Sequence, residues 1–352
     1  MVTKMFFFHQ ILLKPLRLSM VNFPFNSLPK ELKIDITSYL SPQDAARLGA
    51  SCKWNYFLTY EFGKATVRDL LRAVLKTDNK KLVKQMLKSG VDPAADDNRA
   101  IVRAAQNGRT EIVRLLLGDS RVNPGADDNR AIVRAAKNGY TEVVKLLLGD
   151  ERVNPGADDN YAIALAAFRD QLEVVKLLLG DSRVDPGAQN NWAIRRAAKD
   201  GSMELVRLLL GDSRVNAGAQ NNWAIRQAAE NGHTEVVKLL LGDERVNPGG
   251  YGNLAIICTA QKGHTEVVRL LLSDPRVNPG ADDNNAIRLA ALKGHTEVVR
   301  LLLSDPRVNP GAQNNRAIKC AAAHGHEDVV ELLRNDPRVG RGALNKIIFV
   351  NF

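Results

Sequence analysis

Residues 98 to 345 repeat one pattern of apolar, small and polar positions with a period of 31. The clearest marker is an asparagine that recurs eight times at this spacing, as Asn98, Asn129, Asn160, Asn191, Asn222, Asn253, Asn284 and Asn315. A degenerate copy precedes them at residues 67 to 96. A fixed period of this length predicts a solenoid, in which each unit covers its apolar faces with its neighbours.

Each unit predicts two short helices. In the first copy, Ile101, Ala104 and Ala105 share one helix face, with Asn98 as the expected N-cap and Gly108 as the expected end. Neither helix is long enough to be stable alone in water, so each pair is expected to depend on the next pair for its core.

The second helix of the unit is predicted to carry most of the buried mass. Thr110 is its expected N-cap, Glu111 lies in the first turn, and the apolar stripe runs from Ile112 to Leu117. Asp119 and Arg121 follow and recur in every unit, which favours local pairing of opposite charges.

The segment A-A-x-x-G-H-T-E-V-V-x-L-L-L followed by x-V-N resembles the ankyrin repeat, and the match recurs eight or nine times. The usual Thr-Pro-Leu-His start of that repeat is replaced by forms such as residues 99–102. We therefore expect the repeated asparagine to substitute for the Thr/His hydrogen-bond network. We also expect the D-x-R-V-N-P-G connection to be a turn or loop, without a full β-hairpin.

The segment before the repeats has another pattern. Three short helices are predicted within residues 27 to 58, with too little core for independent folding. The order of residues resembles the F-box, the motif by which substrate receptors dock onto the Skp-type adaptor of cullin-RING ubiquitin ligases. That resemblance implies adaptor-binding roles for Leu28, Pro29, Leu32, Ile36, Leu40, Leu48 and Trp54. Ala45 and Ala46 stand where the motif usually has a bulkier aliphatic residue, and a plain helical cap on the first repeat is the alternative.

The predicted fold is all-α, with a short three-helix F-box-like head followed by an ankyrin-like helical solenoid of about nine 31-residue repeats. Residues 1–26 are expected to be a poorly ordered extension, 27–60 the F-box-like motif, 67–345 the array and 346–352 a C-terminal cap. His9 and Gln10 split the apolar start into pieces too short for a signal peptide, so neither secretion nor a membrane span is expected. An acid-poor presequence and a start at Met20 stay open.

A repeat array carries its specificity at the columns that vary between units. Among the columns that vary most are those one, four and nine positions after the repeated asparagine. In ankyrin-type folds these columns line the concave face. Aromatic and basic residues gather there in three consecutive units. The predicted target-binding residues are Tyr161, Phe168, Trp192, Arg195, Arg196, Lys199, Trp223 and Arg226. The alternative is that Trp192 and Trp223 stack on each other and serve packing.

Charge and composition narrow the function classes. The chain has a net charge of +10, of which the first 60 residues contribute +4 (seven basic and three acidic residues). The excess in the array is too thin for a dedicated nucleic-acid domain. Aromatic residues make up only 5% of the chain, which makes their clustering informative.

No motif for catalysis or cofactor binding occurs, so neither an enzymatic activity nor a cofactor is expected. His233, His264, His295 and His326 recur at 31, but repeats about 10 Å apart cannot place them around one metal ion. Structural Gly-His caps are the favoured interpretation.

The favoured function is that of a monomeric, cytoplasmic substrate receptor. It docks onto the Skp-type adaptor and cullin-RING ligase and holds an unknown target protein on the concave face, with no nucleic acid and no membrane as partners. A scaffold without a ligase role is the alternative. The combination resembles effectors of intracellular bacteria and proteins of large DNA viruses, in which case the host cytosol is the expected location.

Overall fold

The computed structural model describes residues 80–88 and 91–340. Regular structure within these ranges is entirely α-helical, as predicted. The chain divides into two compact units, and α6 (Lys80–Lys88) spans residues of both. The second unit holds eight helix pairs, one for each repeated asparagine, and the expected head and C-terminal cap lie outside the described residues.

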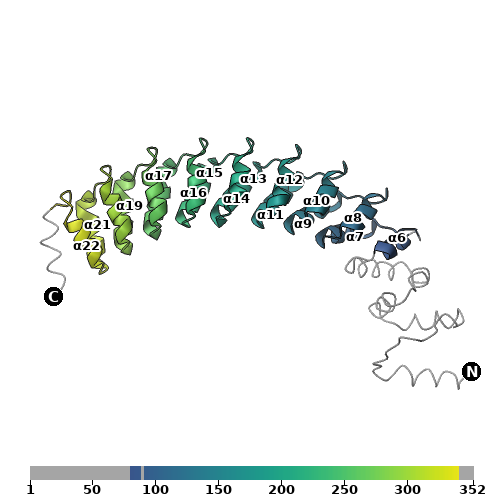
Figure 1. Cartoon of the computed structure of the whole chain (residues 1–352), viewed down its shortest axis with the longest axis horizontal. Coiled ribbons are helices and arrows are strands. Elements are labelled where there is room, and N and C mark those ends of the chain that lie inside the picture. The colour runs from purple at the N-terminus through teal and green to yellow at the C-terminus, as the bar shows by residue number, and fades with distance from the viewer. Residues whose placement is uncertain (1–79, 89–90, 341–352) are drawn as a thin grey trace, which may run out of the picture. The chain divides into compact units, whose positions relative to one another are not determined.

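The eight pairs follow one another in chain order, and neighbouring pairs lie side by side (Figure 1). The first helices are α7 (Ala95–Gln106), α9 (Ala126–Lys137), α11 (Ala157–Phe168), α13 (Ala188–Asp200), α15 (Ala219–Glu230), α17 (Gly250–Lys262), α19 (Ala281–Lys293) and α21 (Ala312–Ala323). The second helices are α8 (Thr110–Leu117), α10 (Thr141–Leu148), α12 (Leu172–Leu179), α14 (Met203–Leu210), α16 (Thr234–Leu241), α18 (Thr265–Leu272), α20 (Thr296–Ser304) and α22 (Glu327–Arg334). The segments between pairs contain turns and no strand in the described residues, as expected.

The core is repeated with the sequence. Ile101, Ala104 and Ala105 of α7 are buried, and so are Val113 and Leu116 of α8. Because alanine is small, the first helices of neighbouring repeats approach closely and pack on each other more extensively than the second helices do. Every repeat therefore depends on its neighbours for burial of its apolar face.

A left-handed turn of three residues opens each first helix and was not predicted. Asp96, Asp97 and Asn98 have φ angles of 55°, 53° and 60°, and the corresponding residues of the other seven repeats share this conformation. Asn and Asp tolerate the left-handed region better than other side chains do. The right-handed turns of the helix begin only after the asparagine.

The turn that precedes seven of the eight first helices has glycine for a different reason, and Ala94 takes its place before α7. A Cβ atom on Gly125 would lie 2.5 Å from the carbonyl oxygen of Arg152 in the next repeat. At Gly125 the two backbones thus approach too closely for a side chain, which explains the glycine.

Candidate functional site

The repeated asparagine joins the start of each repeat to the turn that leads into the next repeat. Asn98 is buried, and its Oδ1 accepts a hydrogen bond of 2.7 Å from the backbone N–H of Asn123. The other seven asparagines make the same bond to the residue 25 positions later. The prediction that Asn98 caps its own helix is wrong, because the residue lies inside a left-handed turn and not in the extended conformation of an N-cap.

Thr110 is not an N-cap either. It is the first residue of α8, and Arg109 before it makes no side-chain cap bond. The Thr110 hydroxyl instead donates to the Gly108 carbonyl oxygen at 3.5 Å. Gly108 itself has a φ of 68° just after α7, where the sequence placed the end of the first helix.

The predicted local pairing of the Asp-x-Arg segments is confirmed. Asp150 accepts hydrogen bonds from Arg152 Nε at 2.9 Å and Nη2 at 2.6 Å, and these bonds lower the pKa of the Asp150 carboxyl. Arg152 also donates to the carbonyl oxygens of Val122 and Leu117 in the preceding repeat. Leu117 is the last residue of α8, so the guanidinium satisfies the end of a neighbouring helix.

The histidines also contact the preceding repeat. His233 Nε2 lies 2.9 Å from the Lys199 carbonyl oxygen near the end of α13, and His264, His295 and His326 repeat this contact. The predicted role as structural caps is confirmed. The described residues contain no group of three or more metal-ligating side chains that could hold an ion.

The predicted target-binding residues lie on three consecutive first helices, α11, α13 and α15. Tyr161 is 41% exposed and Phe168 is 38% exposed, while Trp192 and Trp223 are half-buried. Phe168 and Trp192 contact each other across the repeat boundary, with ring centroids 6.2 Å apart.

The two tryptophans do not form the ring pair that was the packing alternative. Each ring has another neighbour in the described structure: Trp192 lies against Phe168, and Trp223 lies beneath Arg195. The Arg195 guanidinium carbon is 5.3 Å from the Trp223 ring centroid. Within the described residues, these contacts therefore join three successive repeats. Phe168 contacts Trp192 of the next repeat, and Arg195, on the same helix as Trp192, contacts Trp223 of the repeat after that.

Tyr251 extends this series into the next repeat and was missed. The Arg226 guanidinium carbon lies 4.8 Å from its ring centroid, and the Tyr251 side chain is 61% exposed. The sequence signal was present, because Tyr251 occupies a column that holds aspartate or glutamine in the other repeats. We call Phe168, Trp192, Arg195, Trp223, Arg226 and Tyr251 together the arginine–aromatic surface.

Two further arginines contact Phe168. The guanidinium carbons of Arg196 and Arg169 lie 4.5 Å and 5.4 Å from its ring centroid. Arg196 also pairs with Asp200, at 2.6 Å from Nε to Oδ2. Arg169 was not among the predicted residues, whereas Lys199 and Tyr161 were predicted but make none of these ring contacts in the described structure.

Arg195 is the most electrostatically unusual member of the surface. Its Nε atom is buried without a hydrogen-bond partner in the described structure, and burial lowers the pKa of its guanidinium. Its Nη2 donates to the Gln189 carbonyl oxygen at 3.3 Å. A cation that has lost water without gaining an anion is unfavourable until a partner supplies one.

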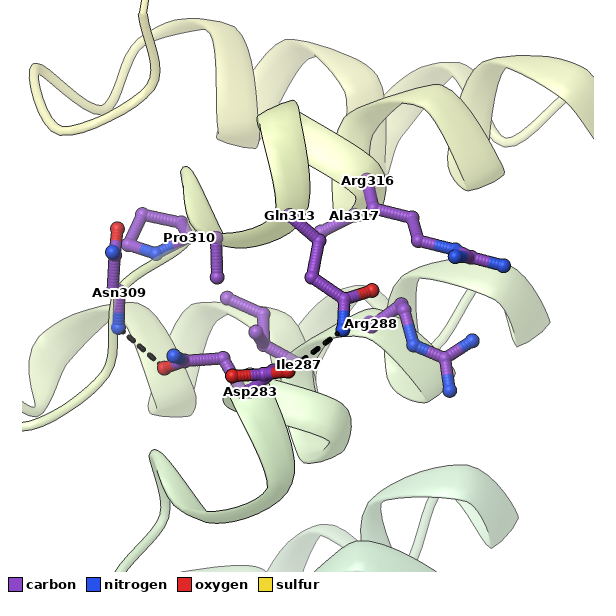
Figure 2. Close-up of a pocket in the computed structure, with 10 residues that line it drawn as sticks. Asp283, Ile287, Arg288, Asn309, Pro310, Gln313, Arg316 and Ala317 are labelled. Atoms are coloured by element: carbon purple, nitrogen blue, oxygen red, sulfur yellow. Dashed lines mark hydrogen bonds between the residues drawn. The ribbon is translucent and has the colours of Figure 1, made fainter.

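A shallow hollow lies between α19 and α21. Figure 2 shows Gln313 reaching Asp283 across it, at 3.1 Å from Nε2 to Oδ2, with Arg288 and Arg316 at its rim. No aromatic residue lines this hollow. It lacks the ring faces that distinguish the arginine–aromatic surface.

The segment before the repeats and the repeat array each match a known family. Residues 70–160, 104–190, 163–250, 194–283 and 254–341 match the family described as "Ankyrin repeats (3 copies)". Residues 25–61 match the family described as "F-box-like", and the predicted adaptor-binding residues fall within that match but outside the described residues. No curated protein matches the chain. None of the described helices is long and apolar enough to cross a membrane. The chain belongs to the ankyrin-repeat family and is an F-box protein with ankyrin repeats.

Proposed function

We propose that the protein is a substrate receptor of a cullin-RING ubiquitin ligase of the SCF type. In this proposal, residues 27–60 dock onto the Skp-type adaptor through Leu28, Pro29, Leu32, Ile36, Leu40, Leu48 and Trp54. The array holds a target protein on its concave face. In this proposal the protein is a cytoplasmic monomer and does not bind nucleic acid. The main support is the F-box-like match at residues 25–61 directly before an array of interaction repeats.

The receptor contributes placement and no chemistry of its own. F-box and ankyrin-repeat domains are interaction modules, so the ligase would supply the catalysis. Holding the target near the ubiquitin-loaded enzyme raises the effective concentration of the two reactants.

Co-purification tests the docking step. The tagged chain, expressed in eukaryotic cells, is expected to enrich the adaptor and the cullin, and a Leu28→Ala/Pro29→Ala variant is expected to lose both. Equal recovery from the two forms, or no recovery, would contradict the receptor function. An interaction scaffold without a ligase role would retain its target but recover no adaptor.

The arginine–aromatic surface is the proposed target site, together with the predicted residues Tyr161, Arg196 and Lys199 around it. Large, stiff aromatic side chains beside arginine are typical of residues that dominate binding energy. Trp192→Leu/Trp223→Leu is expected to abolish recovery of targets found by proximity labelling. The column of Trp192 and Trp223 already holds leucine in the next repeat, at Leu254, so the variant is expected to fold. Arg316→Leu in the same column is the matched control.

A further inference from the structure

The left-handed turns change charge where the arginine–aromatic surface lies. The two residues before the repeated asparagine are Asp-Asp in the turn at residues 158–159 and again at 282–283. In the three repeats between them these residues are Gln-Asn at 189–190, Gln-Asn at 220–221 and Tyr-Gly at 251–252. Three consecutive turns thus carry no acid, and acidic turns border them on both sides.

The arginines beside the neutral turns have no carboxylate partner. Arg226 Nε donates to the Asn221 carbonyl oxygen at 3.1 Å, and Arg195 bonds to the Gln189 carbonyl oxygen. Neither arginine forms an ion pair within residues 80–88 and 91–340, and Arg288, which occupies the same column beside the acidic turn at residues 282–283, bonds to Asn285 and forms none either. Arg195 and Arg226 are thus stacked cations without an ion-pair partner in the described structure, and the neutral turns beside them supply no carboxylate.

Stacking prepares these guanidinium groups for an anion. A guanidinium held over an aromatic face has lost side-chain freedom before binding and keeps its planar N–H edges for acceptors. The carboxylate of aspartate or glutamate has two oxygens, which can accept two parallel hydrogen bonds from one guanidinium. It would also compensate the buried charge of Arg195.

We propose that the arginine–aromatic surface binds a short acidic segment of the target protein, with carboxylates paired to Arg195 and Arg226. This inference rests on the proposed function, because it names the chemistry of the target at the same site. The surface lies on four consecutive first helices, which span roughly 30 Å at ordinary helix spacing, and an extended peptide covers this span with about nine residues. A longer polyanion such as single-stranded nucleic acid would meet the bordering aspartates, which favours a peptide.

Selection from a peptide-display library on the full chain tests the proposal. The selected peptides are expected to carry at least two acidic residues within about six positions. Replacing those residues by glutamine is expected to weaken binding at least tenfold, because a charge-assisted pair is lost. Tryptophan fluorescence reports binding, since two of the three tryptophans of the chain, Trp192 and Trp223, lie in the surface.

A variant of the turns provides the matched test on the protein side. The double substitution Gln189→Asp/Gln220→Asp places a carboxylate of the protein itself beside Arg195 and Arg226. It is expected to weaken the binding of acidic peptides at least tenfold. Aspartate occupies this column, with positive φ, in the turns at Asp96, Asp127 and Asp158, so the fold accepts it. Gln313→Asp makes the same substitution away from the surface, where it removes the hydrogen bond to Asp283, and is expected to leave peptide binding unchanged.

The outcomes separate the inference from the proposed function. In one set of outcomes, the selected peptides require Trp192 and Trp223 yet carry no acidic residues, or bind equally well to Gln189→Asp/Gln220→Asp. Either result would overturn the proposal that the target segment is acidic, while the surface would remain a binding site. Peptides indifferent to Trp192→Leu/Trp223→Leu overturn the surface itself, as does a selection that yields no peptide. Displacement by a single-stranded oligonucleotide with steep salt dependence would assign the surface to nucleic acid.

Discussion

Asp170 holds a φ of 55° at the end of α11, where Gly108, Gly139 and Gly201 have the left-handed conformation in neighbouring repeats. Glycine adopts this conformation without strain, whereas aspartate tolerates it better than most residues but still at a cost in free energy. Asp170 directly follows Phe168, which belongs to the arginine–aromatic surface, and Arg169, which contacts the Phe168 ring. Local stability is therefore lower where the repeats depart from their common sequence.

Asp170→Gly is expected to stabilise the array by about 0.5–1 kcal/mol, because it removes the strain of the left-handed conformation. Urea unfolding followed by circular dichroism measures the change. Glu173→Gly, one turn later inside α12, is the contrasting variant and is expected to destabilise by about 1 kcal/mol. Equal destabilisation by both variants would show that Asp170 is not strained.

The sequence predicted which residue types form the surface better than it predicted their contacts. Variable columns identified Trp192, Trp223, Arg195 and Arg226, but which ring each arginine covers depends on the register between repeats. Tyr251 was missed because it lies in the turn and not on the helix, where the variable columns had been compared. A left-handed turn at that position could not be predicted from helix periodicity.

At the scale of the helices, apolar spacing was sufficient to predict two helices in every repeat. The ends of those helices were predicted less well, because their partners come from other repeats. The α14 helix ends at Leu210, whose carbonyl oxygen accepts a hydrogen bond of 2.7 Å from Arg245. Cap rules that consider only neighbouring residues of the chain do not include a donor 35 positions away.

The pairing of Arg245 with Asp243 makes this helix end sensitive to pH. Hydrogen bonds from Arg245 lower the pKa of Asp243 in the folded state below its ordinary value, about 3.9 in an unfolded chain. A lowered folded pKa adds stability that is complete above the unfolded pKa and is lost as the pH falls through the folded pKa. The pair therefore stabilises at pH 7 and contributes progressively less below about pH 4.

Asp243→Asn is expected to cost roughly 0.5–1 kcal/mol at pH 7, because one largely surface ion pair is lost. The difference from the unchanged protein is expected to shrink at pH 3, where protonation removes the charge of Asp243 itself. Urea unfolding at the two pH values measures both differences. A difference of the same size at pH 3 would assign the contribution of Asp243 to turn geometry and not to charge.

At the scale of the array, all the bonds described between repeats join immediate neighbours. The arginine and histidine contacts each cross one boundary, as Arg245 and His264 illustrate. The asparagine bond, as in Asn222, closes the repeat onto its own last turn. The period alone predicted this architecture, because units that repeat in sequence must repeat their contacts. The head could be predicted only by its resemblance to the F-box, since its sequence does not recur elsewhere in the chain.

Removal of one whole unit is expected to leave a folded array. Deletion of residues 284–314 and deletion of residues 191–221 each remove 31 residues and restore the same boundary sequence. Both shortened arrays are expected to melt cooperatively, at similar temperatures slightly below that of the full chain. Only the second removes Trp192 and Arg195, so only the second is expected to lose target recovery. Loss of the target from both deletions would mean that the target contacts the array beyond the arginine–aromatic surface.

The pattern of hydrogen bonds within and between adjacent repeats also determines how the array would respond to force. A load applied to the two ends of the array passes through every repeat boundary in series, because no described bond bypasses a repeat. A repeat that yields releases a contour of roughly 100 Å, at about 3.3–3.6 Å for each extended residue. Stretching would then lengthen the array in near-equal steps, and the repeat that contains Asp170 is expected to yield early.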